Sequence, residues 1–123
     1  MKKLLFVLLS LLFVFSMQSD AQNYPPRTFV MQPTGWFAPY KDPLAVLDYT
    51  IDWTQWLSTD TISTSSWTCD TGITIQASSN TTTGATVWLA GGTNGTTYRV
   101  TNTIRTAGGR TRIQSFFVPV SNR

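Results

Sequence analysis

The chain has 123 residues, of which 12% are charged, and Thr, Ser, Gly and Asn fill most of its polar positions. It contains no Glu and no His, so a Ser, Thr or Cys nucleophile lacks its usual base and a transition metal has few ligands. The net charge of +3 falls to +2 beyond residue 22 and is dispersed, which argues against a nucleic-acid-binding face. A lone cysteine, Cys69, excludes an internal disulfide framework.

Residues 1–22 have the three-part organisation of a secretory signal peptide. Two lysines precede an apolar run from Leu4 to Met17, and small residues follow, so cleavage is expected after Ala21. We expect this hydrophobic segment to be helical, but it falls short of the roughly 20 apolar residues of a transmembrane helix. Any membrane contact would be transient and confined to export. The alternative is that translation starts at Met31, and both interpretations stay open.

Residues 23–43 are rich in Pro and aromatic residues and follow no period, which predicts an extended arm or linker. The aromatic residues of this arm, Trp36, Phe37 and Tyr40, are candidate interface residues because aromatic anchors dominate protein interfaces. They either pack back on the following domain or dock into a neighbouring protein.

From residue 44 the sequence alternates between apolar and polar residues, which predicts strands. In the first strand, one face carries Leu47, Tyr49, Ile51 and Trp53, and the other carries Asp48, Thr50 and Asp52. Further strands are expected at Ile62 to Cys69, in GITIQA, and in ATVWLAG, where Val87 and Leu89 share a side. Thr, Val, Ile and aromatic residues favour strands, so an all-β domain follows.

The clearest pattern is the last hairpin. Its first strand alternates through Tyr98, Val100, Asn102 and Ile104, and its second places Phe116, Val118 and Val120 inward. The glycines of residues 107–109 supply the turn.

The segment GGTNGTTYRV resembles a tyrosine corner, in which the Tyr98 hydroxyl bonds to backbone just upstream. Short strands with turn signals about every ten residues describe a sandwich. We therefore predict an immunoglobulin-like antiparallel β-sandwich of about seven strands over residues 44–123, without the cystine.

Asp48 and Asp52 are the candidate catalytic pair, and the strand interpretation separates them by about 13 Å. A glycosidase pair needs about 5 to 9.5 Å, so the two carboxylates cannot cooperate on one bond. A calcium site lacks the D-x-D-x-D-G loop. We expect no catalytic residue, no metal and no cofactor, and predict that the protein is not an enzyme.

The strings KDPLAVLDYTIDWTQWL, DTISTSSWT, TTTGATVWLAGGTNGTTYRVTN and TAGGRT occur in that order between Lys41 and Val120. In this the chain resembles small structural proteins of tailed bacteriophages, the fibre–tail adaptors or head–tail region proteins. The resemblance implies an immunoglobulin-like virion component that contacts other tail, neck or fibre proteins without catalysis.

Such a small sandwich would suit a homo-oligomeric ring in the particle. Virion proteins assemble without export, so the signal-like N-terminus keeps an alternative open. In that alternative the chain is a secreted or periplasmic module, cleaved near Ala21, for adhesion or carbohydrate binding at a bacterial surface.

Overall fold

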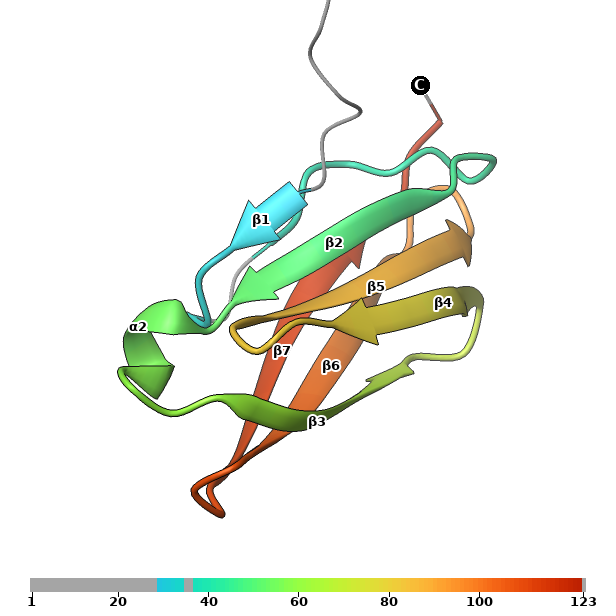
Figure 1. Cartoon of the computed structure of the whole chain (residues 1–123). Coiled ribbons are helices and arrows are strands. Elements are labelled where there is room, and N and C mark those ends of the chain that lie inside the picture. The colour runs from blue at the N-terminus through green and yellow to red at the C-terminus, as the bar shows by residue number, and fades with distance from the viewer. Residues whose placement is uncertain (1–28, 35–36, 123) are drawn as a thin grey trace, which may run out of the picture.

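The computed structural model describes residues 29–34 and 37–122, so the signal-like segment 1–22 lies outside the described residues. The described chain forms strands and one short helix (Figure 1). In chain order the elements are β1 (Phe29–Met31), β2 (Leu47–Asp52), α2 (Thr54–Leu57), β3 (Ile62–Cys69), β4 (Ile73–Asn80), β5 (Gly84–Gly91), β6 (Thr97–Thr106) and β7 (Thr111–Pro119). The prediction of an all-β protein is confirmed.

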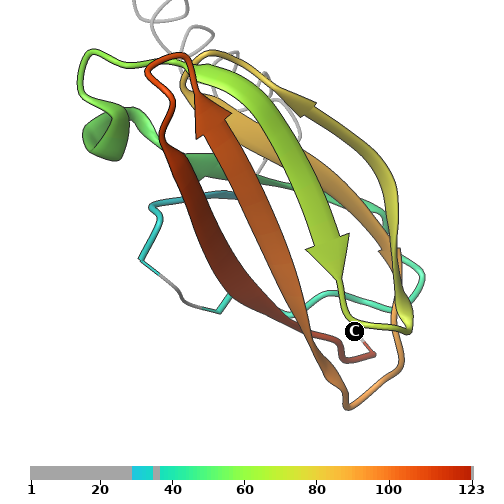
Figure 2. The same cartoon turned by 90° about the horizontal axis from the view of Figure 1, so that it is seen from below.

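The strands form two sheets that face each other (Figures 1 and 2). One sheet has the order β1-β2-β5-β4 and the other the order β3-β6-β7. The predicted hairpin is present, with β6 and β7 paired from Thr97 opposite Pro119 to Arg105 opposite Thr111. Its turn needs a glycine at residue 109, where φ is +86°.

The strand pairs within residues 44–122 are all antiparallel, and the segment before them adds one further strand, β1, which pairs in parallel with β2. This strand comes from the segment that the sequence indicated as an arm. Its three residues lie opposite Tyr49, Thr50 and Ile51. Farther along, Phe37 and Lys41 form isolated parallel bridges with Phe117 and Val120 of the other sheet. The described part of the arm therefore crosses from one sheet to the other and lies against both.

The expected strand around Asp48 ends earlier than its alternation suggested. β2 stops at Asp52, whose carboxylate accepts hydrogen bonds from the backbone N–H and the hydroxyl of Thr54. This contact favours a helical turn, because it satisfies a backbone donor that has no partner within the turn. Trp53 thus precedes α2 instead of extending the strand, although its side chain is fully buried as expected.

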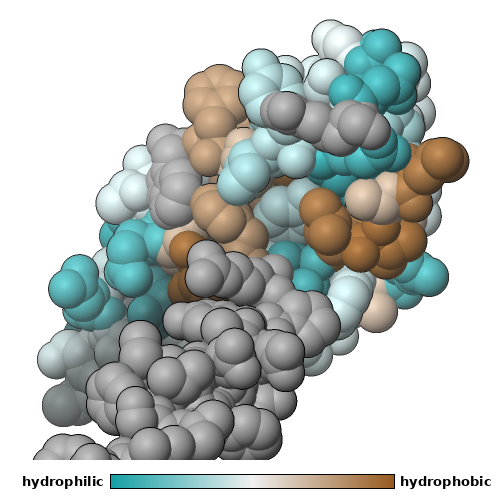
Figure 3. All heavy atoms as spheres, turned by 90° about the horizontal axis from the view of Figure 1, so that it is seen from above, coloured by the Kyte–Doolittle hydropathy of each residue, from teal (hydrophilic) through white to brown (hydrophobic). Residues whose placement is uncertain are grey.

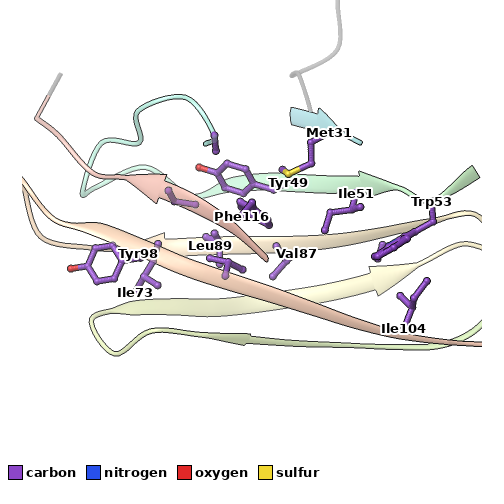
Figure 4. Close-up of a cluster of buried hydrophobic side chains, with 14 of the residues drawn as sticks. Met31, Tyr49, Ile51, Trp53, Ile73, Val87, Leu89, Tyr98, Ile104 and Phe116 are labelled. Atoms are coloured by element: carbon purple, nitrogen blue, oxygen red, sulfur yellow. The ribbon is translucent and has the colours of Figure 1, made fainter. Parts of the chain in front are cut away.

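The core lies between the sheets and is filled by the inward-facing residues of every strand (Figure 4). At its centre an aromatic column crosses the sandwich. The ring of Phe116 lies 5.6 Å from that of Tyr49 and 6.1 Å from that of Trp67. Apolar burial of this kind is the main force that holds two sheets together.

Among residues 29–34 and 37–122, no helix is both long and apolar enough to cross a membrane.

Candidate protein-interaction surface

Large apolar side chains stay exposed along one margin of the sandwich, where the segment 39–46 meets the start of β1 and β2. We call this the apolar margin, and it consists of Val30, Tyr40, Leu44, Val46 and Leu47. Leu44 is 93% exposed and Tyr40 is 58% exposed. Figure 3 shows apolar surface gathered on the face that is seen from above. Exposed apolar groups that cluster in this way mark interaction sites more often than isolated ones do.

A pocket of about 420 Å³ opens within this margin. It is lined by Phe29, Val30, Pro39, Tyr40, Leu47, Asp48 and Tyr49. Its walls come from β1, from β2 and from the segment that pairs with β7, so it lies at the open side between the two sheets. A mainly apolar concavity with few polar groups can receive an aromatic or aliphatic side chain.

Tyr49 contributes a buried phenol to this side of the molecule. Its side chain is buried among Phe29 and Phe116, and its oxygen has no hydrogen-bond partner. Burial, assisted by the negative charge of Asp48, raises the pKa of Tyr49 to about 12. The phenol therefore stays neutral and keeps its proton as a donor at physiological pH.

Two of the three aromatic residues that the sequence singled out lie on the surface of the crossing segment. Phe37 is 62% exposed and stacks on Phe117 with ring centroids 5.1 Å apart. Tyr40 lines the pocket. Trp36 lies outside the described residues. Phe37 and Tyr40 are thus held on the sandwich but outside its core, as interface residues must be.

Lys41 fixes this segment. Its side chain is fully buried, and its ammonium donates to the carbonyl oxygens of Asp42 at 2.9 Å and Gly91 at 2.8 Å. Its backbone N–H donates to Pro119 and its carbonyl accepts from Ser121. Burial lowers the pKa of Lys41, and the charge of Asp42 partly opposes that shift. The aromatic residues beside Lys41 are therefore presented by a tethered backbone.

The two aspartates of β2 are on the outward side of the sheet, as the alternation indicated. The carboxylate of Asp52 stabilises the turn at α2, and the hydrogen bonds that it accepts from Thr54 lower its pKa. In the described part of the chain, no three His, Cys, Asp or Glu side chains gather closely enough to hold a metal ion. Cys69 is half-buried, and burial raises the pKa of its thiol, which leaves it a weak nucleophile at neutral pH.

Tyr98 makes the contact that we expected of it. Its hydroxyl accepts a hydrogen bond from the backbone N–H of Thr93 at 2.9 Å, just upstream of β6. Gly72 leaves room for the ring, because a Cβ there would lie 2.9 Å from a ring carbon of Tyr98. The buried ring and the bonded hydroxyl together fix the loop between β5 and β6.

Replacing Tyr98 with phenylalanine is expected to lower the free energy of unfolding by about 1–2 kcal/mol, because the N–H of Thr93 loses its acceptor while the packing of the ring is kept. Urea denaturation followed by tryptophan fluorescence measures this loss. An unchanged midpoint would show that the hydroxyl adds nothing to stability.

Sequence reasoning missed Leu44 and Val46 as surface residues, and it did not single out Trp88, although the alternation puts Trp88 on the side opposite Val87 and Leu89. Leu44 and Val46 precede β2 in a loop, where an apolar residue gains little unless something outside the loop covers it. Trp88 could have been found, because its neighbours in β5 alternate and place it outward. It is 41% exposed, beside Val46 at a second, shallower hollow.

Residues 41–119 match a protein family described as "Podophage GP4 fiber-tail adaptor protein gp77". The chain belongs to this family. The match covers more than half of the chain and runs from β2 through β7, including most of the apolar margin. Membership of a phage fibre–tail adaptor family assigns the chain a structural role in the virion, in contact with other virion proteins. The alternative of a secreted surface module has no support from this match.

No curated protein matches the chain. Among solved structures, the chain is similar to a cysteine protease inhibitor from Entamoeba histolytica, with a TM-score of 0.45 and 7% sequence identity. That similarity covers 78% of this chain and 99% of the other.

Proposed function

We propose that this fibre–tail adaptor binds a neighbouring tail, neck or fibre protein through the apolar margin and the pocket within it. The observation that carries the proposal is a pocket walled by the exposed side chains of Val30, Tyr40 and Leu47, with the 93%-exposed Leu44 in the loop between Tyr40 and Leu47. When a partner covers an apolar patch of this kind, the binding free energy becomes more favourable by about 25 cal/mol per Å² of apolar surface removed from water.

The fixed backbone of the crossing segment supports this role. Lys41 ties the segment to the loop at Gly91 and to the end of β7. A surface that is ordered before binding loses less conformational entropy when the partner docks. Phe37 and Tyr40 supply the aromatic anchors, and hot spots of interfaces are rich in such residues.

The sandwich itself is proposed to be immunoglobulin-like. In support, its strand order divides four and three, as in constant-type immunoglobulin domains, and Tyr98 bonds to backbone upstream of the penultimate strand. The parallel pairing of β1 departs from that plan. We also propose that the chain has no catalytic activity, since its function requires only contact surfaces.

The adaptor is further proposed to act as a homo-oligomeric ring in the particle. A small sandwich has a modest core, and repetition around a symmetry axis multiplies each of its contacts.

The test replaces Leu44 with aspartate and Tyr40 with serine in the phage genome. Both side chains are largely exposed, so the fold should be kept while a charge and a smaller polar group replace the apolar contact. We expect incorporation of the adaptor into purified particles to fall by about tenfold or more, since a lost anchor costs at least 1–2 kcal/mol of binding. Quantitative mass spectrometry of particles measures incorporation, and plaque counts measure infectivity.

Two control variants separate docking from folding. Leu44→Met keeps an apolar side chain in the margin and should be incorporated normally. Gln55→Ser changes an exposed residue of α2, at the other end of β2, and should also be neutral. Normal incorporation of the Leu44→Asp/Tyr40→Ser variant would refute the docking role of the apolar margin.

A further inference from the structure

The charged residues of the described chain are divided between the two sheets. All four described arginines lie in β6, in β7 or in the turn between them: Arg99, Arg105, Arg110 and Arg112. The described aspartates all lie elsewhere in the chain, at Asp42, Asp48, Asp52, Asp60 and Asp70. The remaining cation of this part of the chain, Lys41, is buried. In space, however, Asp60 and Asp70 lie against this hairpin, where they accept hydrogen bonds from the backbone N–H groups of Gly108 and Arg99, so the separation of charge holds for the outward faces of the sheets.

The division is sharpest on the outward faces of the sheets. We call the outward side of the four-stranded sheet the acidic face, because its strands present Asp48 and Asp52 and no cation. We call the outward side of the three-stranded sheet the basic face. Its strands present Arg99 and Arg105 and no carboxylate. At the end of this face, the carboxylate of Asp70 in the turn after β3 accepts a hydrogen bond from the backbone N–H of Arg99.

Each face also has a large aromatic residue directly beside its charge. Asp48 of the acidic face is the cross-strand partner of Trp88, which is partly exposed. Arg99 of the basic face is the cross-strand partner of Phe117, on which Phe37 stacks. An acid beside an aromatic ring on one face can thus meet an arginine beside an aromatic ring on the other.

The edges of the sheets are less suited to self-association than the faces. β3 and β4 are both edge strands, and each has an irregular register, at Ile62/Thr64 and at Ile75/Ala77. Irregularities of this kind are a common device against edge-to-edge pairing. At the outer edge of β7, Phe37 and Lys41 already make backbone bridges. Contacts between copies are therefore favoured through the faces.

We propose that the acidic face of one copy binds the basic face of the next copy. The contact is heterologous, because two different surfaces of the same chain meet. Repeated contacts of this type close into a ring when the rotation between copies allows it. The proposal rests on the ring suggested under the proposed function and specifies the surfaces that build it.

The closing experiment measures the mass of the purified full chain by light scattering after size exclusion, over a range of concentrations. The wild-type chain should form species larger than a dimer. Raising the salt to about 1 M, where the screening length falls to about 3 Å, should weaken the association by about tenfold. A wild-type chain that stays monomeric at every concentration in low salt would overturn the proposal.

Reversing the charge of either face tests the pairing. The variants are Asp48→Arg for the acidic face, and Arg99→Asp with Arg105→Asp for the basic face. Each should weaken self-association by about a hundredfold, because like charges then meet or attraction is lost. Arg110→Asp makes the same type of charge change in the turn, outside the face, and should assemble like the wild type.

A mixture of the two variants gives the most specific result. Each variant keeps one intact face and the two reversed faces are again opposite in charge, so an equimolar mixture should recover species larger than either variant forms alone. A mixture that stays monomeric, or variants that assemble as the wild type does, would overturn the proposal. Thermal melting of each variant verifies its fold, and the salt dependence of the wild type provides the test if a variant is unfolded. Failure here leaves docking at Leu44 and Tyr40 untouched, since light scattering of the purified chain is measured without any other virion protein, whereas docking is measured as particle incorporation of the Leu44→Asp/Tyr40→Ser variant.

Discussion

Replacing Phe116 with alanine is expected to lower the free energy of unfolding by about 3–5 kcal/mol. Phe116 is 1% exposed, and its ring is the middle of the aromatic column between Tyr49 and Trp67. Truncation removes the contacts of both neighbours and leaves a cavity between the sheets, which packed strands fill only in part. A small domain is stabilised by about 5–15 kcal/mol in total, so this loss is a large share of it.

Phe117 offers a matched control for that substitution. It is the next residue of β7, but it points outward and is only half-buried against Phe37. Phe117→Ala should cost clearly less than Phe116→Ala, and chemical denaturation of both variants gives the comparison. Equal losses would mean that the core does not depend on the column. The Phe116→Ala chain should also be incorporated poorly into particles, because the sheets that position Tyr40 and Leu44 are loosened.

The alternation of apolar and polar residues predicted most of the strands, for a physical reason. In β6 every second residue faces the core, so Tyr98, Val100 and Ile104 could be assigned inward from the sequence alone. The outward position of Trp88 follows from the same rule. Even the polar Asn102 follows the alternation and is fully buried.

Other features depend on partners far along the chain and left no local signal. β1 has three residues in a Pro-rich segment, and its pairing with β2 depends on how the chain folds back. The burial of Lys41 depends on the carbonyl of Gly91, fifty residues away. In a loop without alternation, the sequence alone does not show whether an apolar residue such as Leu44 is buried or exposed in the fold. The sequence thus indicated Phe37 and Tyr40 as candidate interface residues, whereas the pocket beside Tyr40 could be found only from the structure.

Replacing Asn102 with leucine is expected to lower the free energy of unfolding by about 2–4 kcal/mol, even though an apolar side chain of similar size fills its place. The Asn102 carbonyl accepts from the indole N–H of Trp53 at 3.1 Å. Its amide donates to the hydroxyl of Ser65 at 2.9 Å and to the carbonyl of Ser66 at 3.0 Å. One buried side chain therefore links β6 to β3 and to the end of β2.

The cost arises from the groups that remain behind. With leucine at this position the Trp53 N–H stays buried with no acceptor, and each buried polar group without a partner costs about 1–3 kcal/mol. Asn80→Leu is the matched control, because Asn80 is exposed in β4 and bonds only locally to the carbonyl of Thr81. Its substitution should change stability by less than about 0.5 kcal/mol.

A double-mutant cycle with Trp53→Phe identifies the bond itself. Phenylalanine removes the indole N–H, so the Asn102→Leu substitution should cost about 1 kcal/mol less in the Trp53→Phe background than in the wild type. Additive losses would show that Trp53 and Asn102 stabilise the sandwich independently. A positive coupling would show that the bond between the end of β2 and the centre of β6 holds the two sheets in register. The opposed acidic and basic faces then keep a fixed relation to each other, as assembly of identical copies into a closed ring requires.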